Sequence, residues 1–477
     1  MDMKAKTVDR ELFESSPVIN AIFRLAIPTV VGQIILVIYN MADTFFIGQT
    51  GSDAKITAAT VCMPAFMFLS AISNLFGVGG SSVISRAMGS RNHTRVRQAS
   101  AFACWGCFAL TLVYALFTLL FSDLFINLLG GKAPEAHQFA KSYLLITVTI
   151  GGVFTAMSTL LAHLIRSEGR ALQASIGIML GGILNIALDP LFMFVLLKPG
   201  QEIIGAAVAT TLSNVVSLIY FILVLRSNHS KSGLRFAPSR DMLERSVVRD
   251  VFNAGLPACL MTLMENISYA VLDNLMAAYG MACQAGLGVA KKINMLAHCI
   301  VRGMAQGVLP LIGYNYSSRN FKRMKQAVLY SGILSVSMAL LCLVINVIFS
   351  TQLVSIFIRS EGSTALADGA LFLRILCLGG PFSAWAYTVI SFFQATGKGG
   401  RSFLLAILRK GVLDIPMMFI LNHALQASGI VMATPITDVI CSVVAMVLFI
   451  SFLRTHSYKT EAVMAEIDSG RDVVTGA

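Results

Sequence analysis

The chain has 477 residues, of which 56% are hydrophobic and only 13% are charged. Soluble proteins carry about 25% charged residues, so this composition excludes a set of soluble domains and predicts a protein whose main solvent is lipid. Lys and Arg exceed Asp and Glu, with a formal net charge of +12. In a membrane protein this excess is expected on cytoplasmic loops, so we expect no nucleic-acid partner.

Apolar runs in chain order predict twelve transmembrane helices, since a bilayer needs about 20 apolar residues per helix. A cytoplasmic tail at 1–18 precedes an N-terminal lobe at 19–226, with spans near 19–47, 54–83, 98–121, 138–165, 171–197 and 203–225. A cytoplasmic linker at 227–249 leads to a C-terminal lobe at 250–453, with spans near 250–278, 283–312, 326–350, 366–394, 401–422 and 429–453. Residues 454–477 form a second cytoplasmic tail. We therefore expect an all-α integral membrane fold of two six-helix lobes.

The distribution of basic residues predicts the orientation of these spans. Connectors after the even-numbered spans are rich in Lys and Arg, with Arg86, Arg91, Arg95, Arg97, Arg319, Lys322, Arg323 and Lys325 among them. Connectors after the odd-numbered spans hold few, namely Lys55, Lys132, Lys198 and Arg359. Positive loops stay in the cytosol, so both termini are expected there.

The second half of the sequence repeats the first. Matching positions are Arg91-Asn92 with Arg319-Asn320 (offset 228), Tyr39 and Asp43 with Tyr269 and Asp273 (offset 230), Asp189-Pro190 with Asp414-Ile415-Pro416, and the run from Gly205 with the run from Gly429 (offset 224). Six spans return the chain to its starting side, so the repeats are parallel and related by a pseudo-twofold axis along the membrane normal. Two such lobes can rock against each other and give alternating access to a cavity.

Several of these segments resemble a known family. YNMADTFFIG at 39–48, EGR at 168–170 and LNIALDP at 184–190 are similar to motifs of the multidrug and toxic compound extrusion (MATE) transporters, in particular the DinF-like branch with its MepA-like bacterial members. The resemblance covers about residues 19–453. It implies a monomeric antiporter of the bacterial inner membrane, in contact with lipids, that exports amphipathic and often cationic drugs or toxins in exchange for H⁺ or Na⁺ and uses no other cofactor.

Two carboxylates inside the predicted N-terminal spans are the first candidates for a functional site. An ionised carboxylate in hydrocarbon needs a partner, a proton or a watery cavity. Asp43 lies in the first span, Asn185 and Asp189 lie one turn apart in the fifth, and Pro190 interrupts that helix. Thr210 lies near the outer end of the sixth span. In the resembled family these four positions match a cation-binding cluster, so we expect a site for H⁺ or Na⁺; the alternative is a hydrogen-bond network that packs the spans.

Other intramembrane polar residues are candidates for the substrate cavity. They are Tyr39, one turn before Asp43, together with Glu265 and Asp273 of the seventh span and Lys292 of the eighth. For Glu265 the alternative is a structural ion pair with Lys291 or Lys292. The four charged residues Arg409, Lys410, Asp414 and Asp438 of the last two spans are expected to pair among themselves.

The sequence also separates the candidate functions. No G-x-x-x-x-G-K-[ST] phosphate loop and no hydrolase arrangement occurs outside the spans, so we expect neither an ATPase nor another enzyme. The main alternative is a lipid-linked oligosaccharide flippase of the same superfamily, since Lys291, Lys292 and Arg302 could face a pyrophosphate. A channel or an intramembrane enzyme has less support, because a channel does not need two rocking lobes.

Overall fold

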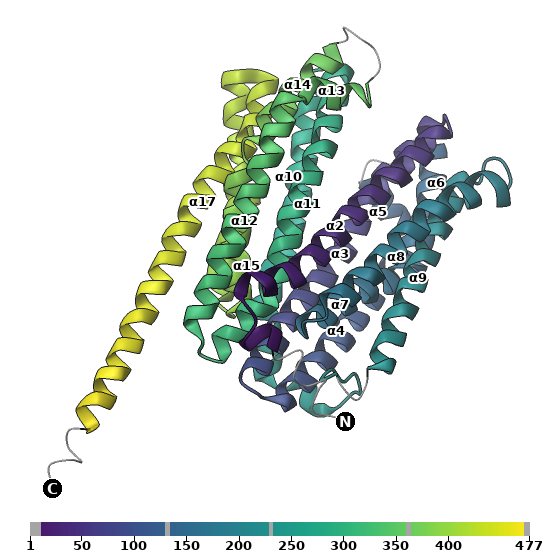
Figure 1. The fold of residues 1–477 in the computed structure, drawn as a ribbon. Helices are drawn as coiled ribbons and strands as arrows, with labels where there is room; N and C mark the ends of the chain where they lie inside the picture. Colours follow the sequence, from purple (N-terminus) through teal and green to yellow (C-terminus); the bar gives the residue numbers. More distant parts are fainter. Residues whose placement is uncertain (1–10, 129–133, 229–231, 359–363, 472–477) are drawn as a thin grey trace.

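The computed structural model describes residues 11–128, 134–228, 232–358 and 364–471, and these are almost entirely helical (Figure 1). Two of the basic residues used for the orientation, Lys132 and Arg359, lie outside the described residues, as do the ends of both predicted tails, 1–10 and 472–477.

The N-terminal lobe contains the helices α2 (Val18–Gln49), α3 (Asp53–Gly89), α4 (His93–Leu120), α5 (Ser122–Leu128), α6 (Pro134–Leu144), α7 (Gly152–Ser167), α8 (Ala171–Pro190) and α9 (Glu202–Ser227). Two π-helical segments belong to it, η1 (Leu145–Ile150) between α6 and α7 and η2 (Leu191–Leu196) after α8. The short 3₁₀ helix η3 (Arg240–Leu243) lies in the predicted linker.

The C-terminal lobe contains α10 (Arg245–Ala277), α11 (Met281–Ser317), α12 (Phe321–Ile348), α13 (Ser350–Ser355), α14 (Thr364–Cys377), α15 (Gly380–Ala395), α16 (Gly399–Ile407) and α17 (Asp414–Arg471), with the π-helical segment η4 (Leu408–Val412) between the last two. α17 extends to Arg471, into the segment assigned from the sequence to a cytoplasmic tail.

The helices account for the twelve predicted spans. Nine helices of the described chain are long and apolar enough to cross a membrane, and the count rises to eleven when each of two bent pairs forms one span. These pairs, α6–η1 with α7 and α14 with α15, bend by 46° and 43°. Gln426, which has non-helical backbone angles, divides α17 into two helices and supplies the twelfth span. The prediction of an all-α, two-lobed membrane fold is confirmed.

The internal repeat is visible in matching turns. Asn92 begins α4 and its side chain accepts a hydrogen bond from the Arg95 amide, and Asn320 begins α12 and accepts one from the Arg323 amide. The residue before each cap has a positive φ, 57° at Arg91 and 60° at Arg319. The same capped turn, which satisfies a free helix N–H group, therefore occurs at the same place in both lobes.

The lobes pack most closely in the half of the molecule that contains the linker. A Cβ atom at Gly255 of α10 would overlap the Leu75 carbonyl oxygen of α3, so the two backbones meet directly. Further from the linker, Asn74 Nδ2 donates to Thr262 Oγ1 at 2.9 Å across the same helix pair. In Figure 1 the two groups of helices meet in the lower part of the view and diverge toward the top, away from the linker.

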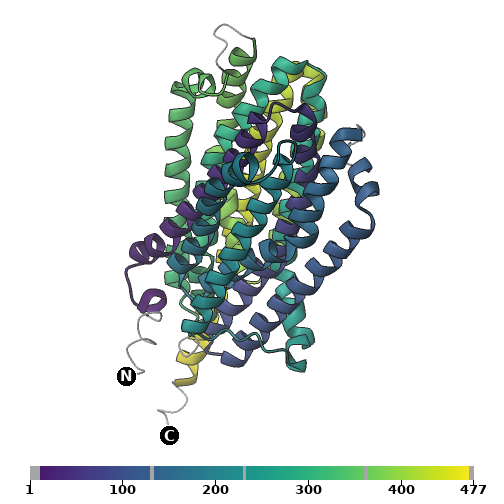
Figure 2. The ribbon, with the colours of Figure 1, turned by 90° about the vertical axis from the view of Figure 1, so that its right-hand side faces the viewer.

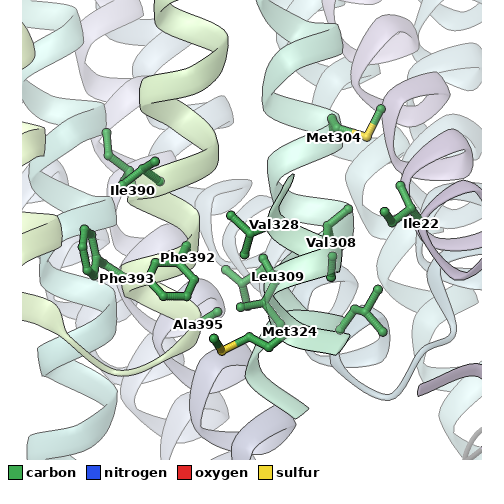
Figure 3. Close-up of a cluster of buried hydrophobic side chains, with 14 of the residues drawn as sticks. Ile22, Met304, Val308, Leu309, Met324, Val328, Ile390, Phe392, Phe393 and Ala395 are labelled. Atoms are coloured by element: carbon green, nitrogen blue, oxygen red, sulfur yellow. The ribbon is translucent and has the colours of Figure 1, made fainter. Parts of the chain in front are cut away.

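A buried apolar cluster joins the lobes on this side. Figure 3 shows Ile22 of α2 beside Met304 and Val308 of α11, while Phe392 and Phe393 of α15 approach from the other direction. Ile22, Phe392 and Phe393 are fully buried. Burial of such side chains contributes about 1.5–3 kcal/mol each, so this cluster holds α2 of one lobe against α11 of the other.

The linker is fixed to the N-terminal lobe by Glu168, the residue that follows α7. Its carboxylate accepts hydrogen bonds from Ser232 Oγ at 2.9 Å and from the Gly233 amide at 2.7 Å, and Arg170 lies 3.2 Å away. Glu168 and Arg170 belong to the EGR motif, which therefore anchors the linker. The first turn of α2 and the end of α17 lie toward the same end of the molecule (Figure 2).

Candidate functional site

Three of the predicted site residues form a hydrogen-bonded group between α8 and α9. Asn185 Nδ2 donates to Asp189 Oδ1 at 3.3 Å, one helical turn away, and lies 3.1 Å from Thr210 Oγ1. All three side chains are buried, and Asp189 has no exposed surface. The i, i+4 spacing seen in the sequence therefore places the amide between the carboxylate and the hydroxyl.

Asp43 joins this group from α2. It lies within electrostatic range of Asp189, and Tyr143 of α6 lies near it. The ring of Tyr39, one turn earlier on α2, packs against Gly182 of α8. The structure thus brings together Asp43, Asn185, Asp189 and Thr210. We call these four residues the N-lobe cluster.

The N-lobe cluster contains oxygen atoms without partners. Asp43 Oδ1, Asn185 Oδ1 and Asp189 Oδ2 are buried and accept no hydrogen bond among the described residues. Buried polar atoms in proteins are almost always paired, so three such oxygens in one cluster are atoms that a cation or a proton could satisfy. Hard oxygen atoms suit Na⁺, and a carboxylate suits H⁺.

The ligands that the cluster could offer are all hard oxygen atoms. Its two carboxylates, one amide and one hydroxyl contain no nitrogen or sulfur ligand of the kind that holds transition metals. Over the part of the chain that the structure describes, no group of three or more His, Cys, Asp or Glu side chains could hold a metal ion.

Local irregularities of the helices surround the polar residues. The π-helical segment η1 begins two residues after Tyr143, and η2 begins two residues after Asp189. In the other lobe, η4 contains Arg409 and Lys410. π-helical turns often accompany functional sites because they shift the register of side chains and free backbone groups. Each π segment in the described chain is thus next to a buried polar cluster.

The C-terminal lobe contains a second buried polar group, in which the charges are paired. Arg409 Nε lies 2.7 Å from Asp438 Oδ1, and Lys410 Nζ lies 3.1 Å from Asp414 Oδ2. All four side chains are at most 3% exposed. The prediction that these residues pair among themselves is confirmed.

The ion pair expected as the alternative role of Glu265 has a different partner. Glu265 Oε2 accepts from Arg302 Nη2 at 2.8 Å, whereas Lys291 Nζ binds Asp273 at 2.6 Å. Pairing of Glu265 with Lys291 or Lys292 is therefore wrong. Lys291 lines the same small cavity as Glu265, but its ammonium binds Asp273, so Glu265 is paired by Arg302 instead.

The four candidates for the substrate cavity do not lie together. Tyr39 is next to the N-lobe cluster. Glu265 lines a small cavity of the other lobe, roughly large enough for one water molecule, which Tyr269 and Lys410 also line. Asp273 is half-exposed in its ion pair with Lys291, and Lys292 is an exposed residue.

Sequence reasoning missed two partners of the buried carboxylates. Tyr143 lies near Asp43 on a helix distant in the chain, and no motif indicates it. Ser268 Oγ donates to Asp414 Oδ2 at 2.6 Å. The repeat could have pointed to the second residue, because Ser268 precedes Tyr269, the counterpart of Tyr39.

Two parallel helical lobes with a buried cluster of polar side chains in one of them define a multi-pass membrane protein built like a secondary transporter. The MatE family model matches residues 28–191 and 257–420, one match in each lobe. The chain therefore belongs to the MatE family.

Relatives and solved structures agree with this assignment. The chain is 29% identical over 457 residues to the multidrug export protein MepA of Staphylococcus saprophyticus, covering 95% of this chain and 98% of the relative. It is 29% identical over 440 residues to MepA of Staphylococcus aureus strain MRSA252, covering 91% and 94%.

Among solved structures, the chain is similar to a multidrug resistance MATE family transporter of the MOP superfamily in an outward-facing conformation. The TM-score is 0.85 at 26% identity, with 95% of this chain and 99% of that chain covered. A MOP superfamily transporter from Pyrococcus furiosus gives a TM-score of 0.82 at 26% identity, with 92% and 97% covered.

Proposed function

We propose that this protein is a secondary antiporter of the bacterial inner membrane, which exports amphipathic and often cationic small molecules in exchange for H⁺ or Na⁺. The observation that carries the proposal is the set of unpartnered oxygens on Asp43, Asn185 and Asp189, buried in a lobe of a MatE-family fold. Two carboxylates near each other in a buried place bind a cation to relieve their repulsion. The names of the relatives support drug export.

Coupling follows from the position of the two carboxylates on different helices. With both ionised, Asp43 on α2 and Asp189 on α8 repel each other. A bound Na⁺ or proton removes the repulsion and lets α2, α8 and α9 close around the cluster. Because α2 also packs against α11 of the other lobe through Ile22, a shift of α2 changes the lobe interface. Rocking of the lobes would then expose the substrate cavity alternately to the two sides.

The proposed orientation places the linker and both termini in the cytoplasm. The basic residues of the turns after α3 and α11, such as Arg91 and Arg319, lie on the linker side of the fold. Arg95 of the next turn binds Asp250 at 2.7 Å there. A cytoplasmic linker side agrees with the positive-inside rule and directs the diverging ends of the lobes outward.

The flippase alternative has less support from the charges. A pyrophosphate requires cations whose charge is not already balanced, but Lys291 and Arg302 form ion pairs with Asp273 and Glu265. For the same reason, Glu265 and Asp273 as contacts of a cationic drug stay predictions, because the drug would compete with these pairs. Tyr39 and Lys292 as cavity residues also stay predictions.

Transport by reconstituted protein tests the proposal. The wild type in liposomes should drive ethidium movement when an opposing Na⁺ or proton gradient is imposed, with the effective ion identified by imposing each gradient alone. Asp43→Asn and Asp189→Asn should each reduce gradient-driven transport to background, because an amide cannot exchange a proton and holds a cation more weakly.

The matched control is Asp123→Asn. Asp123 lies on the short helix α5, is 58% exposed and pairs with Lys141 at the surface, so its variant should transport like the wild type. Full gradient-driven transport by Asp43→Asn or Asp189→Asn, at equal protein in the membrane, would contradict the proposal.

A further inference from the structure

The internal repeat relates each residue of the N-lobe cluster to a residue of the other lobe. With the offset of 230, Asp43 corresponds to Asp273, and with the offset of 224, Thr210 corresponds to Thr434. Asp189 and Asp414 both precede a proline-containing turn and differ by 225, and the same offset relates Asn185 to Lys410. The pattern N-x-x-x-D of one lobe is thus K-x-x-x-D in the other.

The repeat-related residues of the C-terminal lobe also form one hydrogen-bonded group, with different partners for the threonine and the residue before the aspartate. Thr434 Oγ1 lies 3.1 Å from Asp414 Oδ1, and Lys410 Nζ lies 3.1 Å from Asp414 Oδ2. In both lobes the residue one helical turn before the aspartate donates to it. The threonine of the next span bonds Asn185 in the N-lobe cluster but the aspartate itself in the other lobe. The ammonium of Lys410 takes the position that the neutral amide of Asn185 has in the N-terminal lobe.

The two aspartates differ accordingly in how their oxygens are satisfied. Both oxygens of Asp414 accept hydrogen bonds, and Ser268 of α10 adds a third donor at 2.6 Å. Asp189 keeps one buried oxygen without a partner among the described residues. At the position of Ser268 the N-terminal repeat has Ile38, which cannot donate a hydrogen bond.

From this correspondence we propose that residues Lys410, Asp414, Thr434 and Ser268 form a second, repeat-related monovalent cation site whose ion is built into the chain as the Lys410 ammonium. The proposal deepens the proposed function, on which it rests for the role of the N-lobe cluster. According to this proposal, the N-lobe cluster is the one exchangeable ion site of the protein. The ammonium in the C-terminal lobe is covalently attached and cannot be released.

The surroundings of Lys410 agree with a fixed cation. Tyr269, the counterpart of Tyr39, presents its ring to the ammonium at 5.7 Å, a favourable cation–π geometry. The other charged groups near it are Arg409, Asp438, Glu265 and Lys291. Each of them is paired: Arg409 with Asp438 at 2.7 Å, Glu265 with Arg302 and Lys291 with Asp273. Lys410 and Asp414 are therefore left as a separate neutral pair, and removal of the lysine charge would leave a buried carboxylate in need of a cation.

The experiment removes the lysine from a protein whose N-lobe cluster has been disabled. Lys410→Asn in the Asp189→Asn background is purified in detergent, and its Tm is followed as NaCl replaces choline chloride at constant ionic strength, and separately as the pH is lowered. The background variant Asp189→Asn should show little response. The double variant should start from a lower Tm and rise by several degrees with Na⁺ or on acidification, because a ligand that binds the folded state stabilises it.

The control adds Asp414→Asn to the double variant, which should remove the gained response. An Asp189→Asn/Lys410→Asn protein whose Tm responds to Na⁺ and pH no more than Asp189→Asn alone would overturn the proposal. The Tm measurement does not depend on transport. If the wild type exchanged no ion in liposomes, the proposed function would be contradicted, but the Tm comparison between the variants would still test the second site.

The reciprocal variant keeps the proposal testable if Lys410→Asn does not fold. Asn185→Lys places an ammonium beside Asp189, as Lys410 stands beside Asp414. The variant should stay folded, and both its ion response and gradient-driven transport should fall to background. An Asn185→Lys protein that still exchanges the coupling ion would contradict the idea that a lysine at this repeat position substitutes for the ion.

Discussion

The two lobes share one architecture and each has a buried aspartate at the corresponding position, Asp189 and Asp414, yet they balance its charge differently. In the N-lobe cluster, Asp43 and Asp189 have no cationic partner in the described chain. In the C-terminal lobe, Asp414 and Asp438 bind Lys410 and Arg409. The two lobes thus have the same fold, but the fold alone does not determine which partners surround an equivalent aspartate. On our proposal, the presence or absence of a fixed cation decides whether a buried carboxylate stabilises the fold or accepts an exchangeable ion.

The largest expected effect separates two equivalent aspartates. Asp414→Asn leaves the fully buried Lys410 without its carboxylate and should lower the free energy of unfolding by about 3–5 kcal/mol. Asp189→Asn removes no ion pair and should leave stability within about 1 kcal/mol of the wild type while transport is lost. Denaturant or thermal unfolding of the purified proteins measures this. Equal losses of unfolding free energy in the two variants would contradict the proposed difference between the lobes.

A second prediction concerns the Arg409–Asp438 pair. Arg409→Met alone leaves Asp438 buried and unpaired and should cost about 3–5 kcal/mol. The double variant Arg409→Met/Asp438→Leu removes both charges and should recover most of that stability, since apolar replacement of a whole buried pair is often neutral. Unfolding measurements on the single and double variants test it. A double variant less stable than the single one would show that this pair does more than balance charge.

The two threonines provide a smaller, matched test. Thr434→Val removes one hydrogen bond to Asp414 and should lower the free energy of unfolding by about 1 kcal/mol without changing ion dependence. Thr210→Val removes a hydroxyl from the N-lobe cluster and should raise the ion concentration for half-maximal transport by about five- to tenfold. Ion titrations of transport by both variants distinguish the roles, and a similar shift in both would argue against them.

The smallest effect on stability is expected at Asp273, the counterpart of Asp43. Its side chain is 44% exposed in the pair with Lys291, and exposed pairs contribute about 0–1 kcal/mol. Asp273→Asn should therefore unfold like the wild type and keep gradient-driven transport, whereas Asp43→Asn loses transport. Parallel assays of the two variants suffice. Loss of transport in Asp273→Asn would place this residue in the substrate cavity, as the sequence had suggested.

The sequence predicted most of the fold because lipid imposes a simple pattern. Long apolar runs predicted all twelve spans, and the repeat of Arg91-Asn92 at Arg319-Asn320 predicted two similar lobes. The N-lobe residues were predicted to be neighbours because helix period and depth restrict which polar residues can meet. Contacts that depend on side-chain length and helix rotation were not predictable, and for that reason the partner of Glu265 was assigned wrongly and Tyr143 was missed.

The exchange of Asn185 for Lys410 between the repeats also has a genetic consequence. The codons for asparagine and lysine differ only in their third base, so one point mutation converts an amide at this position into a fixed ammonium. On the proposal made above, a lobe would lose an exchangeable ion by this one substitution, while the helices, the aspartate and the threonine around it stay unchanged. The proposal therefore implies that duplicated proteins of this architecture would differ in the number of ions per cycle without any change of fold.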